Sequence, residues 1–326
     1  MRTRLTDVLS IDHPVMLAGM GGVAYAPLVA AVSEAGGYGC LGASTMSSEE
    51  LVAQISDVRS RTSRPFGVDL LTAFPNDLER NVEILIEGGA TSLVAGLGVP
   101  THLVDRCHRA GVLVISLCGK VSHATRALAA GCDIVVAQGT EAGGHTGTVA
   151  TMPLVPMIVD AVGSRIPVVA AGGVFDGRGL AAALALGADG VWVGTRFIAT
   201  HEARAVPGFK DRILESREDD TVISRAYTGK TMRVLRNETT EHYAAHPDLL
   251  RPFPEQLGVA MADGSFHLGG NESTVVDPRR EAYPAGQVVG AIDSLEPAGA
   301  LVERFVREAE ASLARLSPAT TVRSDS

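Results

Sequence analysis

Short apolar runs alternate with longer segments of helical spacing through residues 1–200. Each run is five to seven residues long and is bounded by polar or glycine-rich residues. This is the pattern of buried strands. The predicted strands are Pro14–Gly19, Tyr38–Ala43, Phe66–Leu71, Ser92–Leu97, Val112–Cys118, Asp133–Gln138, Pro167–Ala171 and Gly190–Thr195. The pattern therefore predicts a chain of strands joined by helices.

The segments between these runs predict helices. Apolar residues at helical spacing mark Ala26–Ala35, Val121–Ala130 and Gly177–Leu186. A further helix is expected to begin at Ser47, whose hydroxyl can cap it while Glu50, three residues on, reaches back. Each predicted strand is thus followed by a crossover helix.

Eight strand–helix units are the number found in a TIM barrel. The alternative is an open doubly wound sheet, but the first strand is followed by Gly19-Met20-Gly21-Gly22, which lacks the G-x-G-x-x-G spacing of a dinucleotide fold. We therefore predict an α/β protein, a (β/α)8 TIM barrel over residues 1–200, with a C-terminal extension over residues 201–326 that ends in a long helix.

The extension has a less regular pattern. Ala199–Glu218 is consistent with one helix interrupted at Pro207-Gly208, and His242–Pro278 has no clean period. Leu295–Leu316 predicts a strong amphipathic helix that covers either the barrel or a neighbouring subunit, which leaves a homodimer open. The irregular part looks too small and scattered for a core of its own, so we expect it to pack on the barrel.

Composition and charge narrow the functional classes. Aromatic residues make up 4% of the chain and the net charge is −9, which disfavours a base-stacking surface or a basic footprint for nucleic acid. No run approaches the length of a membrane span, and Asp7 and Asp12 interrupt the place of a signal peptide core. The four cysteines lack C-x-x-C spacing and are expected to be buried thiols. A cytoplasmic location is expected.

Glycines follow the last two predicted strands at the positions where TIM barrels bind phosphate. Gly172-Gly173 comes directly after the seventh strand, and Gly194-Thr195 follows the eighth. Backbone N–H groups in these two loops commonly receive an anion. Tight turns alone would also use glycine, but two such turns at these two loops favour a phosphate site.

The loop after the sixth strand, QGTEAGGHTG, contains the main candidate for catalysis, His145. Because glycines frame it, we expect the histidine to project from a flexible loop and to exchange a proton with a substrate. No metal site is predicted, since no second ligand has the required spacing on this loop. The other eight histidines are expected to be solvated.

Five segments together resemble the nitronate monooxygenase family, which are FMN-dependent TIM-barrel proteins. They are HPVMLAGM, QGTEAGGHTG, PVVAAGGVFDGRGLAAALALGADGVWVGTRF, YTGKTMRVLRN and AGQVVG. The resemblance covers most of the chain and is weakest from about His242 to Pro278. Flavin-dependent enoyl-ACP reductases and flavin oxidoreductases acting on CoA thioesters share the same loops.

The resemblance implies FMN as the cofactor and His145 as the catalytic base. It implies that Gln138 reaches the polar edge or the ribityl chain of the flavin and that Gln287 of AGQ closes over it. The expected cofactor-binding residues are Ala18, Gly19, Met20, Asp69, Gln138, Gly143, Gly172, Gly173, Gly194, Thr195 and Gln287. The implied reaction oxidises an alkyl nitronate with O2 to a carbonyl compound and nitrite.

Two departures from the family pattern leave an alternative open. Asp69 stands where many relatives have asparagine, which would place a carboxylate beside the flavin and disfavour an anionic substrate there. His145 is followed by threonine where nitronate enzymes have arginine, and Lys120 could supply the missing positive charge. The alternative is an NAD(P)H-dependent flavin reductase or dehydrogenase acting on an acyl thioester, with Arg233 and Arg236 as expected members of a cationic channel. A third possibility is a barrel that binds a phosphate-bearing ligand without redox chemistry.

Overall fold

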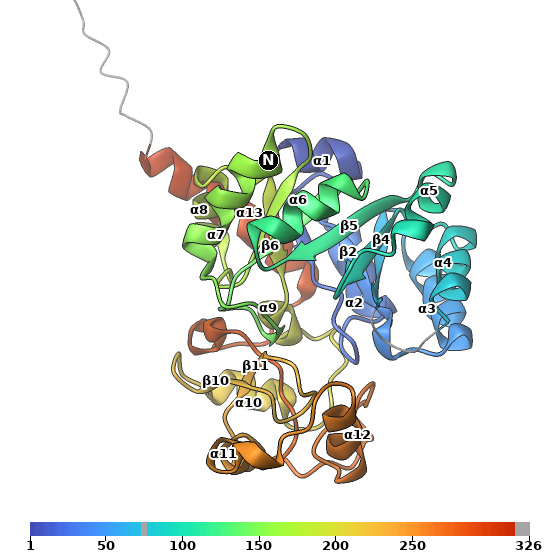
Figure 1. The fold of residues 1–326 in the computed structure, drawn as a ribbon. Coiled ribbons are helices and arrows are strands. Elements are labelled where there is room, and N and C mark those ends of the chain that lie inside the picture. The colour runs from blue at the N-terminus through green and yellow to red at the C-terminus, as the bar shows by residue number, and fades with distance from the viewer. Residues whose placement is uncertain (73–76, 317–326) are drawn as a thin grey trace, which may run out of the picture.

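The computed structural model describes residues 1–72 and 77–316, and its central feature is a barrel of eight parallel strands (Figure 1). The end of the predicted extension, residues 317–326, lies outside the described residues. The barrel strands are β1 (Val15–Leu17), β2 (Gly39–Gly42), β3 (Phe66–Leu71), β4 (Ser92–Gly96), β5 (Leu113–Cys118), β6 (Ile134–Gln138), β8 (Val168–Ala171) and β9 (Gly190–Val193). All eight predicted strands are confirmed.

The sheet closes on itself between its first two strands. The strand order is β1-β9-β8-β6-β5-β4-β3-β2, and a parallel bridge between Met16 and Tyr38 joins its two ends. The main-chain N–H of Leu17 donates to the carbonyl oxygen of Tyr38 at 2.9 Å. The prediction of a (β/α)8 barrel is therefore confirmed.

Helices surround the barrel, and seven of them lie between successive barrel strands. These are α2 (Ala26–Glu34), α3 (Ser48–Arg61), α4 (Leu78–Glu87), α5 (Thr101–Arg109), α6 (Val121–Ala129), α7 (Thr151–Ile158) and α8 (Gly177–Ala185). The helix α1 (Arg4–Leu9) precedes β1, and the short α9 (Thr195–Ile198) follows β9. Ser47 caps α3 as predicted, accepting a hydrogen bond from the N–H of Glu50 at 3.2 Å. The Glu50 carboxylate does not reach back to the cap. It faces Arg204 at 3.6 Å instead. Across the described ranges, no helix combines the length and the apolar character that crossing a bilayer demands.

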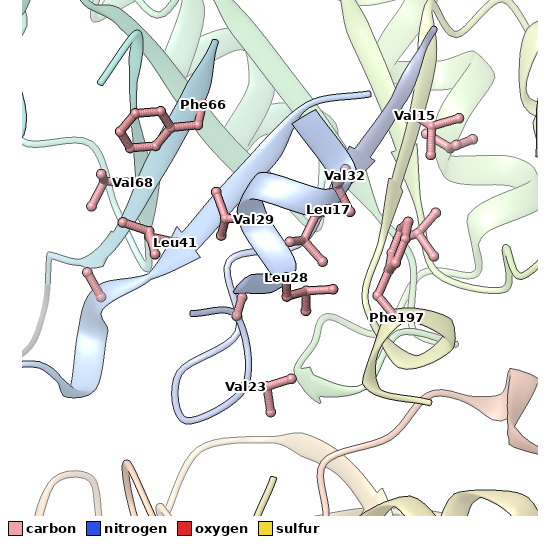
Figure 2. Packing of buried hydrophobic residues seen from close by; sticks show 14 of the residues in the cluster. Val15, Leu17, Val23, Leu28, Val29, Val32, Leu41, Phe66, Val68 and Phe197 are labelled. Carbon is pink, nitrogen blue, oxygen red and sulfur yellow. The ribbon is translucent and has the colours of Figure 1, made fainter. Parts of the chain in front are cut away.

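Side chains alternate between the two faces of each strand, as a period of two requires. Outward-facing residues such as Leu17, Leu41 and Phe66 pack against α2 and the other surrounding helices (Figure 2). Inward-facing residues such as Met16 and Trp192 fill the barrel together with Leu5 of α1. Apolar side chains therefore fill the N-terminal end of the barrel, and the chemistry is left to the opposite end.

Apart from its last helix, the extension covers the C-terminal ends of the barrel strands and forms the lower part of the molecule in Figure 1. It contains α10 (Phe209–Glu215), α11 (Glu238–Ala245), α12 (Glu255–Ala262), β10 (Thr221–Ser224) and β11 (Met232–Leu235). Tyr227, Met232 and Ala260 belong to a separate small apolar cluster. This cluster adds to the packing of the extension on the barrel, where Phe209 and Tyr283 join the main core.

Two segments of the extension differ from the secondary structure that the sequence predicted. Residues 200–208 are not helical, so the helix predicted over Ala199–Glu218 is reduced to α10, which begins directly after Pro207-Gly208. Gly208 has a φ of 77°, and this left-handed turn lets the chain enter α10 in a new direction. The segment His242–Pro278, predicted to be irregular, contains the end of α11 and all of α12.

The last helix, α13 (Ala298–Leu316), confirms the predicted C-terminal helix and packs on α8 and α2 of its own barrel. Its apolar face includes the fully buried Leu301 and Phe305. The N–H of Gly177, at the start of α8, donates to the carboxylate of Glu308 at 3.0 Å. A Cβ atom on Gly177 would stand 2.4 Å from the main-chain nitrogen of Ala309, so the two helices approach backbone to backbone.

We expect Gly177→Ala to lower the free energy of unfolding by about 1–3 kcal/mol, because the added methyl group must push α13 away from α8. Urea denaturation measures the change. The matched control is Gly258→Ala on the exposed face of α12, where a Cβ atom would meet nothing within 4 Å. That control should be neutral or should stabilise by up to about 1 kcal/mol through helix propensity. Equal losses in both variants would contradict the packing argument.

Candidate active site

A cavity of about 950 Å³ lies between the C-terminal ends of the barrel strands and the extension. Its volume is at the upper end of the range for small-molecule sites, roughly 300–1,000 Å³. The predicted site residues that line it are Ala18, Gly19, Met20, Asp69, Gln138, Gly143, His145, Gly172, Gly173, Gly194 and Thr195. The barrel thus brings together residues that are up to 177 positions apart (195 minus 18).

Gln287 is the one predicted site residue that does not line the cavity. Its side chain is exposed, and its N–H donates to the carbonyl oxygen of Glu141 at 3.0 Å. Gly286, the preceding residue, lines the cavity and donates its N–H to the hydroxyl oxygen of Thr195 at 2.9 Å. The main chain of this loop, and not the glutamine side chain, therefore borders the cavity.

His145 lies in a strand and not in a flexible loop, which corrects the expectation from its glycine neighbours. Gly144 and His145 form β7, which pairs antiparallel with β11 of the extension, with His145 opposite Met232. The Gln138 amide donates to the carbonyl oxygen of His145 at 2.8 Å. The amide nitrogen predicted to reach a cofactor is thus engaged in holding the histidine.

The imidazole of His145 is kept neutral by its surroundings. Burial lowers its pKa to about 4, and the positive charge of Lys230 adds to the effect. Its Nε2 atom lies 3.1 Å from the hydroxyl oxygen of Thr228, a buried residue, and no carboxylate contacts the ring among the described residues. His145 is therefore an uncharged imidazole at neutral pH.

The Thr228 hydroxyl holds one nitrogen of the His145 ring. Besides its contact with Nε2, it accepts from the main-chain N–H of Lys230 and is placed to donate to the carbonyl oxygen of Lys230, at 3.3 Å each. When the hydroxyl donates to that carbonyl, Nε2 of His145 carries the ring proton and donates to the hydroxyl oxygen. In that tautomer the basic nitrogen is Nδ1, which has no hydrogen bond among the described residues.

Glu141 holds three loops of the cavity wall together. Its carboxylate accepts hydrogen bonds from the N–H and the hydroxyl of Thr151, at 2.9 Å each, where α7 begins. The same Thr151 hydroxyl lies 3.0 Å from the carbonyl oxygen of Gly172, which follows β8. Gly172 has a φ of 94°, and a Cβ atom there would stand 3.0 Å from the Thr151 hydroxyl oxygen. The turn therefore requires glycine for its conformation and for this close approach.

Asp69 reaches the cavity from the inward face of β3, and no charged side chain pairs with it among the described residues. The residue is 5% exposed, and its Oδ1 has no hydrogen-bond partner in the described part of the chain. Burial raises the pKa of this carboxyl well above its usual range. The sequence suggested a carboxylate that repels anions, whereas the burial found in the structure favours the protonated acid.

Positive charge gathers at the cavity beyond β5, at one of the places that the sequence indicated. Lys120 and Arg126 line the cavity together with His123, whose pKa is lowered first by burial and then by the charges of Arg126 and Lys120. The two arginines expected in a cationic channel do not line it. Arg233 is buried and donates to the carbonyl oxygen of Thr140 at 2.9 Å, and Arg236 is exposed.

Sequence reasoning missed the cavity residues that the extension supplies. Thr228 and Lys230 belong to YTGKTMRVLRN, a segment recognised as a family feature but given no role. His267 was expected to be solvated, but it lines the cavity and contacts the buried Glu281. The family segment could have indicated Thr228 and Lys230, whereas no pattern in the sequence indicates that His267 contacts Glu281.

Comparisons with known proteins agree on one family. A family model described as nitronate monooxygenase matches residues 2–308. The chain is 38% identical to the Mycobacterium tuberculosis (3aS,4S,5R,7aS)-5-hydroxy-7a-methyl-1-oxo-octahydro-1H-indene-4-carboxyl-CoA dehydrogenase, with 95% of this chain and 96% of that protein covered. Among solved structures, FabK from Thermotoga maritima is 36% identical with a TM-score of 0.86, covering 97% of this chain and 98% of that one. A nitroalkane oxidase from Streptomyces ansochromogenes is 30% identical with a TM-score of 0.83, covering 96% and 99%.

The raised pKa of Asp69 makes the free energy of unfolding of this protein depend on pH. In an unfolded chain an aspartate ionises near pH 4, whereas the folded carboxyl keeps its proton to higher pH. The folded state then binds more protons, so stability falls as the pH rises above about 4. We expect Asp69→Asn to raise the free energy of unfolding at pH 7 by on the order of 1 kcal/mol, with the gain shrinking towards pH 4.

Urea denaturation of cofactor-free protein between pH 4 and 8 tests this expectation without a contribution from ligand binding. Asp105→Asn on the exposed face of α5 is the control and should show no such pH-dependent gain. A gain for Asp69→Asn that is the same at every pH would show that the folded carboxyl ionises normally.

Proposed function

Because the chain belongs to the nitronate monooxygenase family of oxidoreductases, we propose that it is an FMN-dependent enzyme that oxidises alkyl nitronates with O2 to a carbonyl compound and nitrite. The observation that carries the proposal is the neutral His145 on the wall of a large cavity. A base that remains uncharged at neutral pH can take a proton from a carbon acid such as a nitroalkane.

The residues of the cavity fit FMN. Gly172 and Gly173 follow β8 with φ angles of 94° and 75°, and Gly194 directly follows β9. Main-chain atoms therefore border the cavity at the ends of two neighbouring strands. These are the loops at which TIM barrels hold phosphate. The unpartnered Oδ1 of Asp69 offers a hydrogen bond to a polar edge of a flat ring system. When bound, FMN supplies the two-electron redox chemistry that connects the substrate carbon with O2.

The chain's own part in the reaction is to hold and move a proton. Nδ1 of His145 accepts the proton from the carbon next to the nitro group, while Thr228 holds Nε2 and thereby the ring. Pairing of β7 with β11 keeps the imidazole from moving away from the substrate. A substrate supplied as the nitronate has already lost this proton, and it then requires binding but no base.

We expect His145→Gln to lower kcat/KM for neutral nitroethane by about 10²–10⁴-fold, the usual size of a general-base contribution. The same variant should lose far less with preformed ethyl nitronate, because that substrate needs no deprotonation. Nitrite release under air measures both rates, and the visible spectrum of bound FMN verifies that the variant retains its cofactor. Undiminished turnover of neutral nitroethane would remove His145 from the reaction, and equal losses with both substrates would point to a defect in binding.

A second candidate function is supported by the positive charges of Lys120 and Arg126 and by the relative named as a CoA dehydrogenase. An acyl thioester of CoA carries phosphate groups that such a cluster attracts, and its α-carbon is also a carbon acid. In this candidate the enzyme is an NAD(P)H-dependent or substrate-oxidising flavin oxidoreductase acting on an acyl thioester. His145 would keep its role as base.

The two candidates predict different effects of removing the cluster. In the thioester candidate, Lys120→Ala combined with Arg126→Ala should raise KM for butyryl-CoA by about 10-fold or more and should weaken its salt dependence. KM for ethyl nitronate should change little, and Arg109→Ala on the exposed face of α5 is the control. An anaerobic visible spectrum with NADPH adds a separate test: bleaching of the flavin supports reductase chemistry, and an unchanged spectrum supports nitronate oxidation.

A further inference from the structure

The cavity contains a second histidine whose surroundings are the opposite of those of His145. His267 follows α12 in the extension, and Glu281 lies in a later segment of the same lobe. Both side chains line the cavity that holds His145. Sequence reasoning gave no role to either residue, and the proton transfer by His145 uses neither.

The two side chains meet through both carboxylate oxygens of Glu281. Nδ1 of His267 lies 2.6 Å from Oε2, and the main-chain N–H of His267 donates to Oε1 at 3.1 Å. The main chain around Glu281 is also fixed, since its carbonyl oxygen accepts from the Asn237 amide at 2.7 Å. The orientation of the His267 ring is thus set by a carboxylate that contacts this residue through both of its oxygens.

Both contacts of the Glu281 carboxylate among the described residues come from His267. The side chain of Glu281 is 1% exposed, whereas that of His267 is 28% exposed. Burial raises the pKa of Glu281, and the contacts with His267 oppose that effect. A buried carboxyl group is costly unless its oxygens are hydrogen-bonded, and His267 supplies these hydrogen bonds.

The pairing determines what His267 can offer to the cavity. With Nδ1 as the donor to the Glu281 carboxylate, the free ring nitrogen is Nε2, which has no hydrogen bond among the described residues. A carboxylate behind an imidazole holds its tautomer and compensates the positive charge when Nε2 also carries a proton. In that state Nε2–H is a charge-assisted donor, which is the kind of group that binds an anionic oxygen.

We propose that the His267–Glu281 pair is a second substrate-binding element of the cavity, in which Nε2–H of His267 donates a hydrogen bond to a negatively charged oxygen of the substrate. The proposal rests on the proposed function and deepens it, because deprotonation of a nitroalkane or a thioester moves negative charge onto an oxygen. His145 and His267 then have different functions. His145 accepts a proton from carbon, and His267 binds the oxygen that becomes negatively charged.

The main test is steady-state kinetics of the FMN-loaded full-length enzyme with ethyl nitronate, whose oxygens are already anionic. We expect His267→Gln and Glu281→Gln each to raise KM by about 10- to 100-fold, the effect of losing one charge-assisted hydrogen bond. kcat at saturating nitronate should change by less than about threefold on the same reasoning. His242→Gln on the exposed face of α11 is the matched control and should leave both constants unchanged.

A second measurement does not depend on turnover or on how the variants fold. In ¹⁵N-histidine-labelled wild-type enzyme, NMR should show the Nδ1–H form of His267, and adding nitrate, an unreactive planar oxyanion, should shift its Nε2 resonance. The His145 resonances report on the same spectrum. Failure of all turnover together with a nitrate-induced shift at His267 would count against the proposed function and not against this pair.

Two results would overturn the inference. One is an unchanged KM for ethyl nitronate in a folded, FMN-loaded His267→Gln enzyme. The other is a Glu281→Gln variant that unfolds at lower urea but binds nitronate as tightly as wild type, which would make the pair a purely structural contact.

Discussion

The hydrogen bonds of Glu141 are the constraint on which the shape of the cavity depends. Its carboxylate accepts from the N–H and hydroxyl of Thr151, and its carbonyl oxygen accepts from the N–H of Gln287. The loop after β6, the start of α7 and the loop at Gly286 are thereby joined at one residue. A carboxylate at the first turn of a helix also interacts favourably with the helix dipole. Since Glu141 lies between β6 and β7, this junction also fixes the segment that leads to His145.

Pairing of β7 with β11 shows how an extension can complete a barrel site. TIM barrels build their sites from loops at the C-terminal ends of the strands, and loops alone are mobile. Here the residue on the loop after β6 becomes part of a three-stranded sheet with β10 and β11. The extension then adds Thr228 and Lys230 around the imidazole. Its contribution is therefore orientation and electrostatics as well as a cover.

The charge states in the cavity follow from burial more than from residue type. No cationic side chain contacts Asp69 among the described residues, and burial raises its pKa. Glu281 is also buried, and its contacts with His267 oppose the same effect. The two histidines differ in a corresponding way, because one faces a hydroxyl and the other a carboxylate. Four ordinary acid–base residues thus acquire four different roles within one cavity.

The amino-acid pattern was enough to predict the barrel, its succession of strands and most of the barrel residues that line the cavity. A strand needs a short apolar run and a helix needs a period of 3.6, and both are local properties that can be counted along the chain. Glycines after the seventh and eighth strands are also local signals. Because parallel strands end at one edge of the barrel, the predicted rim residues from Ala18 to Thr195 had to come together.

Only the tertiary structure decided which side chains the extension contributes and which charges they carry. Gln287 contacts Glu141 through its main-chain N–H, and its side chain is exposed. Arg233 is a buried donor to the carbonyl oxygen of Thr140. His267 met Glu281, which lies 14 residues later in the sequence, at a pairing that no period predicts. Contacts between distant segments and the depth of burial set a pKa, and neither quantity exists until the chain has folded.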